Sequence, residues 1–221
     1  LRADPYAANL VLALPFVSGG LNSGFGDYSA AIKGSGTPKT ITTSNVSIAN
    51  TASYYGSAGF FNGSTGYVSI ADSDDFDFGS GNFTIECWVN PSTTVNTTSY
   101  RRILSQQITA NWIFRLDNQG VFQTIIADGT TSYTITSGAR IDTLGQWTHI
   151  AFVRNGSTLT NYINGVAAGI QTGVTMTIPN ISSTIEVGRY VGGSEYYAGY
   201  IQDLRVYKGV AKYTGGFDVP R

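Results

Sequence analysis

The chain has 221 residues, of which 42% are hydrophobic and 13% aromatic, so it holds enough apolar material for a sizeable core. Charged residues make up only 12%, against about 25% in average soluble domains, so Ser, Thr, Asn, Gln and Gly must cover the surface. The formal net charge of −1 and the lack of a basic run exclude the electrostatic footprint of nucleic-acid binding. No apolar stretch approaches the about 18 residues of a membrane-spanning helix.

The opening L-R-A-D-P lacks an initiating Met and a signal-peptide pattern, so we expect the chain to be a piece of something larger. The single cysteine, Cys87, excludes an internal disulfide and a Cys-based metal site. Strand alternation places Cys87 with Phe83, Ile85 and Val89, which predicts a buried, inert thiol.

The first half of the chain predicts short strands separated by turn residues. These strands are residues 9–17, Lys39–Thr43, Val46–Ala49, two runs within Gly59–Ile70 that flank an Asn-Gly turn, and Phe83–Val89. Asn90-Pro91 is expected to stop the last of them, because proline cannot donate to a sheet ladder. The loop 71–82 carries the aspartates Asp72, Asp74, Asp75 and Asp77.

The second half continues in the same way, with strands predicted at Ile103–Gln107, Trp112–Leu116, Val121–Ala127, Ser132–Thr136, Ile185–Arg189 and Tyr200–Tyr207. Residues 147–172 hold three strand-like runs separated by two Asn-Gly pairs, Asn155-Gly156 and Asn164-Gly165. Asn-Gly is a strong hairpin signal because both residues tolerate positive φ, so a three-stranded antiparallel meander is expected. One helical turn is predicted around Val210–Tyr213.

About a dozen short strands without sustained 3.6-residue periodicity predict a β-sandwich or barrel. Strands this numerous pack as two sheets or close on themselves, because twist limits a single open sheet. No linker or composition break divides the chain, so residues 1–221 are expected to form a single domain.

Several segments then follow one another in a set order: F-N-G-S-T-G-Y-V-S-I (61–70), D-F-D-F-G-S-G-N-F-T-I-E-C-W-V (75–89), W-T-H-I-A-F-V-R (147–154), Y-I-N-G (162–165), I-E-V-G-R (185–189) and G-Y-I-Q-D-L-R-V-Y (199–207). Together they resemble laminin-G-like jelly rolls of the concanavalin A-like group, which includes pentraxins. The resemblance covers residues 59–207 and implies an all-β, antiparallel two-sheet jelly-roll sandwich. The ending K-G-V-A-K-Y-T-G-G-F resembles domains on tailed-phage virion proteins, which implies a virion surface or extracellular location.

The resemblance also implies a calcium site at the sandwich rim, where Asn62 occupies the F-[DN]-G position and Asp203 an acidic position of the last strand. Asn62 is a neutral ligand, and Arg189-Tyr190-Val191 stands where pentraxins carry acidic residues, both of which depart from a site that favours carboxylates. The competing interpretation is structural: a turn at Asn62 and an ion pair between Asp203 and Arg205. The Asp72–Asp77 cluster lacks the Gly and Glu of an EF-hand loop, so a solvated acidic loop is expected there.

Glycan binding is predicted around the G-G-S-E loop, where Tyr190, Tyr196, Tyr197 and Tyr200 cluster in sequence and Glu195 offers a carboxylate for sugar hydroxyls. Tyr54 and Tyr55 offer a second pair of rings. Tyrosine is also common at sandwich rims for its apolar body and polar tip, so a structural role competes with ligand contact.

Catalysis is not expected. Glycosidases need two carboxylates facing one cleft, and none of the three glutamates (Glu86, Glu186 and Glu195) has an acidic residue two or four positions away. The sole histidine, His149, sits mid-strand and is predicted to be structural.

The leading hypothesis is therefore a non-catalytic module of a larger or homo-oligomeric assembly, most naturally a phage particle, that attaches to cell-surface glycans or decorates the shell beside other virion proteins. Its first rival is a structural or oligomerising domain without ligand. A second rival is a degenerate polysaccharide hydrolase or lyase, for which Glu195 and Asp203 would be the first residues to replace.

Overall fold

The structure, a computed structural model, describes residues 4–17, 24–50, 53–54, 56–93, 99–107 and 111–220. Its helical elements are the short turns η1 (Ala7–Asn9), α1 (Ser29–Lys33) and η2 (Asp74–Phe76). Its strands are β1 (Leu10–Leu14), β2 (Ile41–Ser44), β3 (Val46–Ala49), β4 (Ala58–Asn62), β5 (Tyr67–Ile70), β6 (Phe83–Pro91), β7 (Arg101–Gln107), β8 (Asn111–Leu116), β9 (Val121–Ala127), β10 (Ser132–Arg140), β11 (Thr148–Asn155), β12 (Thr158–Ile163), β13 (Val166–Gln171), β14 (Ile185–Val187) and β15 (Ala198–Lys208). None of the described helices is long and apolar enough to cross a membrane.

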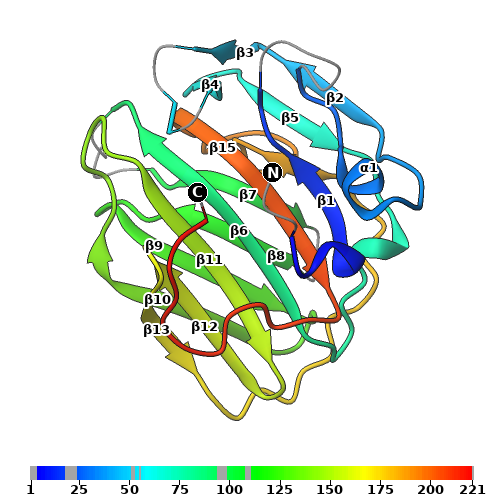
Figure 1. The fold of residues 1–221 in the computed structure, drawn as a ribbon. Coiled ribbons are helices and arrows are strands. Elements are labelled where there is room, and N and C mark those ends of the chain that lie inside the picture. Colours follow the sequence, from blue (N-terminus) through cyan, green and yellow to red (C-terminus); the bar gives the residue numbers. More distant parts are fainter. Residues whose placement is uncertain are drawn as a thin grey trace.

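Two antiparallel sheets pack face to face (Figure 1). The sheet that we call the front sheet has the order β13-β12-β11-β6-β15-β4-β3, and the back sheet has the order β10-β9-β8-β7-β14-β5-β2. Strand β15 pairs with β6 on one side, and with β4 and then β1 on the other. This architecture confirms the predicted all-β, antiparallel two-sheet jelly-roll sandwich.

The core lies between the sheets, and β6 shows how the sequence builds it. Phe83, Ile85, Cys87 and Val89 alternate along one face of β6 and are at most 1% exposed. Cys87 is buried, as predicted, and burial raises the pKa of its thiol well above the ordinary value. All nine residues of β6 are buried, so the outward face of this strand is covered as well.

The predicted meander is confirmed by β11, β12 and β13. Asn164 and Gly165 have φ of 48° and 80°, the two positive values that a type I′ hairpin needs. The first turn differs from the prediction: Asn155 pairs with Thr158 inside the ladder, and the loop is Gly156-Ser157 with positive φ at Gly156. Both faces of β11 are buried, with Ile150 and Phe152 in the main core and Val153 under the tail.

The tail after β15 does not form the predicted helical turn at Val210–Tyr213. It crosses the outward face of the front sheet without regular structure, over β6, β11 and β12 (Figure 1). Its backbone and side chains bond to the sheet instead of to each other: Lys212 N–H donates to Thr84 Oγ1 at 2.9 Å, and Phe217 N–H to Gly165 O at 3.0 Å. These tertiary bonds replace the helical ones.

One smaller prediction also changes. Strand β6 continues through Asn90-Pro91, because Asn90 and Pro91 pair with Tyr200 and Gly199 of β15. The predicted strands on either side of Asn62-Gly63 are present as β4 and β5. They lie in the front sheet and the back sheet, so the turn crosses from one sheet to the other.

Candidate functional site

Two hollows lie at the end of the sandwich where β6 finishes and β15 begins. The sheet hollow, of about 420 Å³, is lined by Ser53, Asn90, Pro91, Ser92, Leu144, Gly145, Trp147 and Tyr200. The loop hollow, of about 500 Å³, is lined by Gly63, Thr93, Ser99, Tyr100, Arg101, Gly193, Ser194, Glu195, Tyr196 and Ala198. They lie next to each other in the chain, since Ser92 lines one and Thr93 the other. Volumes of this size fit ligands the size of one or a few sugar rings.

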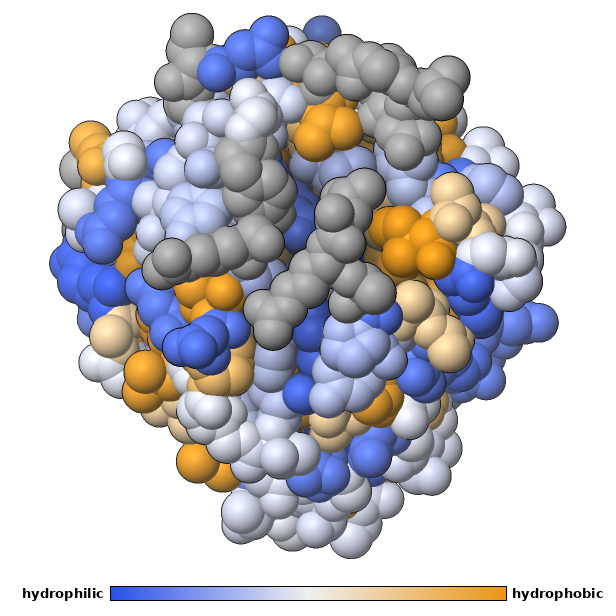
Figure 2. Space-filling view, in the orientation of Figure 1, coloured by the Kyte–Doolittle hydropathy of each residue, from blue (hydrophilic) through white to orange (hydrophobic). Residues whose placement is uncertain are grey.

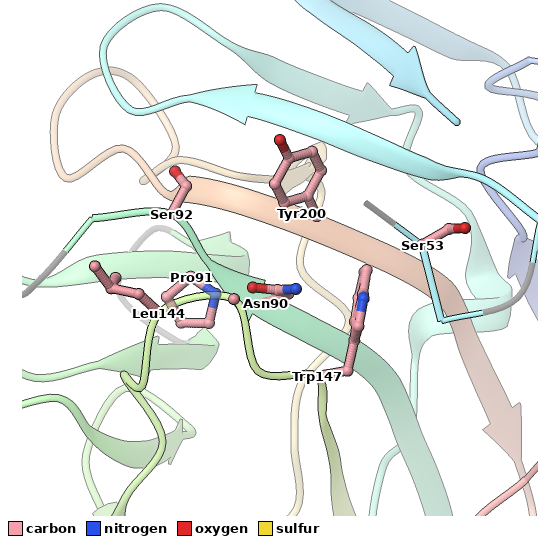
Figure 3. A pocket seen from close by; sticks show the side chains of 8 residues that line it. Ser53, Asn90, Pro91, Ser92, Leu144, Trp147 and Tyr200 are labelled. Carbon is pink, nitrogen blue, oxygen red and sulfur yellow. The ribbon is translucent and has the colours of Figure 1, made fainter. Parts of the chain in front are cut away.

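The front sheet builds the floor of the sheet hollow. Asn90 on β6 and Tyr200 on β15 are cross-strand partners, so their side chains stand next to each other on the outward face. Trp147 comes immediately before β11, whose Thr148 pairs with Val89. Figure 3 shows the result: Tyr200 stands above Asn90 and Trp147 to its right, with Leu144 to the left of Asn90.

Asn90 gives the sheet hollow its polar centre. Its side chain is 4% exposed, yet its Oδ1 has no hydrogen-bond partner in the part of the chain that the structure describes. A buried amide oxygen left without a donor costs about 1–3 kcal/mol, so this acceptor is suited to a hydroxyl or water donor from outside. The half-buried rings of Trp147 and Tyr200 beside it supply apolar surface.

Farther along the same face, Trp88 continues the row of outward-facing β6 residues. Tyr54 stacks on its ring at 3.8 Å between centroids with an interplanar angle of 19°. The indole is therefore covered, and Trp88 is only 3% exposed. Tyr54, one of the two tyrosines predicted as a second pair of rings for a ligand, covers Trp88 instead. Tyr55 lies outside the described residues.

The loop hollow contains two of the residues that the sequence predicts for glycan contact, and a third, Tyr200, lines the sheet hollow. Glu195 and Tyr196 line it, and Tyr190 lies close by, with its ring centroid 4.9 Å from the guanidinium carbon of Arg102. Glu195 has φ of 62° and forms an ion pair with Arg102. The predicted carboxylate is therefore engaged by an arginine on β7.

Tyr197 is corrected by the structure. Its ring is fully buried, packs against Phe61 with centroids 6.3 Å apart, and belongs to the main core. Alternation explains this, because Tyr196 and Tyr197 point to opposite sides of the chain. No face of the Tyr197 ring is left for a sugar.

The two residues of the implied calcium site are not brought together. Asn62 pairs with Ala198 at the start of β15, whereas Asp203 lies five residues farther along, about 17 Å at strand spacing. Asn62 Oδ1 accepts bonds from the N–H groups of Ser64, Thr65 and Gly66, and Asp203 Oδ1 accepts one of 2.7 Å from Arg205 Nε. Both groups serve the structural roles that competed with calcium.

No described group of three His, Cys, Asp or Glu side chains has the arrangement of a metal site. In the acidic loop, Lys39 Nζ lies 2.5 Å from Asp75 Oδ2, and Asn180 Nδ2 donates to Asp74 Oδ1 at 3.3 Å. These contacts tie the loop to neighbouring segments.

Each of the carboxylates considered for catalysis has a basic partner. Glu195 is paired with Arg102, Glu186 with Arg189 and Asp203 with Arg205. Glu86 lies under the C-terminal tail beside Lys212 and His149. His149 is 1% exposed on the outward face of β11, the structural position expected for it.

An antiparallel jelly roll with aromatic and polar hollows at one end defines a lectin-like sandwich. Residues 62–212 match the family model described as the concanavalin A-like lectin/glucanases superfamily, and the chain belongs to that superfamily. No curated protein sequence matches the chain significantly.

Similar solved structures include the binding domain of Paraclostridial Mosquitocidal Protein 1, with a TM-score of 0.73 and 16% identity over 93% of this chain and 50% of that chain. The receptor binding domain of botulinum neurotoxin D has a TM-score of 0.72 and 15% identity over 93% of this chain and 51% of that one. Domain 4 of AbnA, a GH43 extracellular arabinanase from Geobacillus stearothermophilus, solved with arabinotriose, has a TM-score of 0.67 and 21% identity over 92% and 94%. The chain spans about half the length of the two toxin domains, and at these identities the likeness shows the fold.

Sequence analysis missed the sheet hollow, although each of its main residues lies in a segment that it described. Trp147 begins the first strand-like run of residues 147–172, and Asn90-Pro91 follows the predicted strand Phe83–Val89. The sequence signal for this hollow was Asn90, which lies on the face of its strand opposite the apolar residues. A buried amide on that face needs a hydrogen-bond partner, either a neighbouring residue or a ligand.

Proposed function

We propose that this is a non-catalytic carbohydrate-binding domain, formed by residues 1–221 as one unit, whose sheet hollow receives a sugar ring. The ring lies against Trp147 and Tyr200, and one of its hydroxyls donates to Asn90 Oδ1. Ser53 and Ser92 line the same hollow and supply further hydroxyl groups. Sugars carry apolar C–H faces and many donors, so flat rings beside an unsatisfied acceptor match their chemistry.

The single observation that carries this proposal is the buried Oδ1 of Asn90, which has no described partner at the centre of a hollow. A purely structural domain would be expected to satisfy that atom internally, because most buried polar groups in folded proteins are hydrogen-bonded. Figure 2 shows one face of the molecule, on which most described residues are hydrophilic or near-neutral and the hydrophobic areas are small and separate, as suits a polar ligand.

A binding role is favoured over hydrolysis by the state of the carboxylates. Glu195 and Asp203, the first candidates for a degenerate hydrolase, are each paired with an arginine. Neither is among the residues that line the sheet hollow, and none of the described lining side chains carries a carboxylate. General acid–base hydrolysis of a glycoside needs a pair of carboxyl groups on either side of one bond.

The setting of the domain, attachment at the surface of a phage particle or another extracellular assembly, stays a prediction from the resemblance of residues 208–217. In the folded chain this segment packs on its own domain, through Lys212, Tyr213 and Phe217. The packing of residues 208–217 on the front sheet therefore explains their residue types. Contact with other virion proteins or with a second copy of the chain would have to use other surfaces.

Glycan-array binding of the purified domain tests the proposal. We expect binding to at least one neutral oligosaccharide, and loss of about tenfold or more in affinity for Trp147→Ala and for Tyr200→Ala, because each removes one apolar wall. Ile170→Ala, at a residue 62% exposed on the far edge strand β13, serves as the matched control and should bind like the wild type. An array without any bound glycan at high protein concentration would favour the structural alternative.

A further inference from the structure

The sheet hollow has two unlike sides around Asn90. In Figure 3, Leu144 and Pro91 lie to the left of Asn90. Trp147 lies to its right and Tyr200 above it. Pro91 is buried and Leu144 is 49% exposed, so the left side is a small aliphatic surface. The hollow therefore offers a place for a small apolar group next to the aromatic rings that would hold a sugar.

A tight turn holds Leu144 at the rim of the hollow. Gln146 N–H donates to Thr143 O at 3.3 Å, and Gly145 has φ of 72° within this turn, a value that glycine adopts without steric cost. Gly145 N–H also donates to Pro91 O at 3.4 Å, which ties the turn to the end of β6. Of the large hydrophobic side chains that are exposed in the described part of the chain, only Leu144 lines either hollow.

The polar centre of the hollow needs a donor that carries no charge. Its unpaired buried atom, Asn90 Oδ1, can only accept a hydrogen bond. None of the described lining side chains carries a carboxylate, so a bound ammonium group would have no partner for its charge, and an unpaired charge away from water is costly. A neutral N–H or O–H group therefore suits Asn90 Oδ1 better than a protonated amine does.

An acetamido group combines the properties that the two parts of the hollow favour. Its N–H is a neutral donor, its carbonyl oxygen is an acceptor, and its methyl group is apolar. A hydroxyl group at the same position of a sugar ring can also donate to Asn90, but it leaves the aliphatic surface of Leu144 and Pro91 in contact with water. Covering that surface with a methyl group adds hydrophobic stabilisation.

We infer that the sheet hollow binds an N-acetylated sugar, whose acetamido N–H takes the place of a hydroxyl on Asn90 Oδ1. Its methyl group covers Leu144 and Pro91, and its carbonyl oxygen accepts from the hydroxyl groups of Ser53 and Ser92, which line the same hollow. This inference rests on the proposed carbohydrate function and names its substrate class, a neutral oligosaccharide that carries an acetamido group.

Matched sugars, compared by calorimetry, test the inference. One pair is N,N′-diacetylchitobiose and cellobiose, and the other is N-acetyllactosamine and lactose, so that acetamido groups replace hydroxyl groups within each pair. We expect the acetylated member of at least one pair to bind about tenfold tighter, because it buries a methyl group and makes a hydrogen bond of fixed direction. Chitobiose without its acetyl groups, measured in mild acid where its amines are charged, should bind more weakly than the diacetyl form.

Leu144→Ser should reduce this preference to about threefold or less, because it removes most of the exposed aliphatic surface. Leu144 is exposed on a turn, so the variant should fold like the wild type. Ile32→Ser, at an aliphatic residue 42% exposed on α1, is the matched control and should keep the full preference.

Asn90→Leu should reduce the preference as well. An amide N–H is fixed in direction and loses its acceptor, whereas a hydroxyl group can turn towards Ser53 or Ser92. The variant should remain folded, because Asn90 Oδ1 has no described hydrogen bond to lose, and circular dichroism checks this.

Equal affinity within both pairs would overturn the inference and leave the proposed function intact. A preference that persists in both Leu144→Ser and Asn90→Leu would overturn it too, because the acetamido group would then bind elsewhere. The same holds if none of these sugars binds to a protein that does bind another glycan on the array. Absence of binding to every glycan would contradict the proposed function together with the inference.

Discussion

The hydroxyl of Tyr213 donates a 2.6 Å hydrogen bond to Oε2 of Glu86, which lies 127 positions earlier in the chain. Lys212 Nζ lies 2.5 Å from the other oxygen of the same carboxylate, and His149 Nε2 lies 3.5 Å from Oε2. Glu86 is 2% exposed on the outward face of β6. The C-terminal tail therefore closes the front sheet by providing the partners of a buried charge.

Tyr213→Phe should destabilise the domain, because it leaves one oxygen of a buried carboxylate without its donor. The expected cost is about 2 kcal/mol, or about 4–8 °C in Tm for a domain of this size. Thermal unfolding followed by circular dichroism measures it. Thr214→Ala, at the next and exposed residue, is the control, and an equal Tm for the two variants would show that the tail contributes nothing through Glu86.

The stability of the domain should fall in acid as Glu86 is protonated. Burial alone would raise the pKa of this carboxyl group, but the hydrogen bond to His149 and the charge of Lys212 outweigh burial and lower the pKa from 4.5 to about 2. A group with a lowered pKa stabilises the fold above its unfolded pKa, and this contribution is lost as the pH falls from 4.5 to about 2. At about 1.4 kcal/mol per pKa unit it amounts to about 3 kcal/mol.

Chemical denaturation of the wild type and of Glu86→Gln at several pH values between 2 and 7 checks this expectation. The difference in unfolding free energy between them should be constant above pH 5 and shrink below pH 4.5. A constant difference across the whole range would mean that Glu86 does not titrate in this window.

Gly165→Ala should cost much more than Gly156→Ala, although both glycines occupy hairpin turns with positive φ, 80° and 59°. Nothing lies within 4 Å of a Cβ placed on Gly156, whereas one on Gly165 falls on the carbonyl oxygen of Phe217. Gly156→Ala should therefore cost about 1 kcal/mol of conformational strain, and Gly165→Ala should in addition push the tail off the sheet. Urea unfolding and proteolysis of the tail give the comparison, and equal losses would show that the tail does not pack there.

Calcium should not change the stability of the domain. The Oδ1 of Asn62 already accepts three backbone N–H bonds, and Asp203 is paired with Arg205 about 17 Å farther along the sheet. A ligand that binds only the native state raises Tm, so Tm in chelator and in millimolar calcium should agree. A rise of several degrees with calcium would return Asn62 and Asp203 to consideration as ligands.

Much of the fold could be predicted because the residues that favour a strand or a turn lie within a few positions of each other in the sequence. Alternation along Phe83–Val89 and the Asn164-Gly165 turn are each read from a few neighbouring residues, and the structure confirms both. The tail could not be predicted in this way. Its conformation depends on Glu86 and Thr84, more than 120 residues away, whereas its own sequence is compatible with a helical turn.

The candidate site was predictable in part for the same reason. The local cluster of Tyr190, Glu195 and Tyr196 does mark a hollow, but the burial of Tyr197 follows from its alternation into the core beside Phe61. The sheet hollow joins Asn90, Trp147 and Tyr200 from three separate segments. Only the order of the strands in the sheet brings these residues together.

Tryptophan fluorescence tests the central claim most directly, because Trp88 and Trp112 are 3% and 1% exposed whereas Trp147 is half-buried in the sheet hollow. Titration with a glycan identified on the array should shift or quench the emission of the wild type in a saturable way. Trp147→Phe should bind with a similar or slightly lower affinity by calorimetry but show no change in emission. An equal change in emission in Trp147→Phe, or calorimetric binding without any emission change in the wild type, would place the ligand away from the sheet hollow and contradict the account.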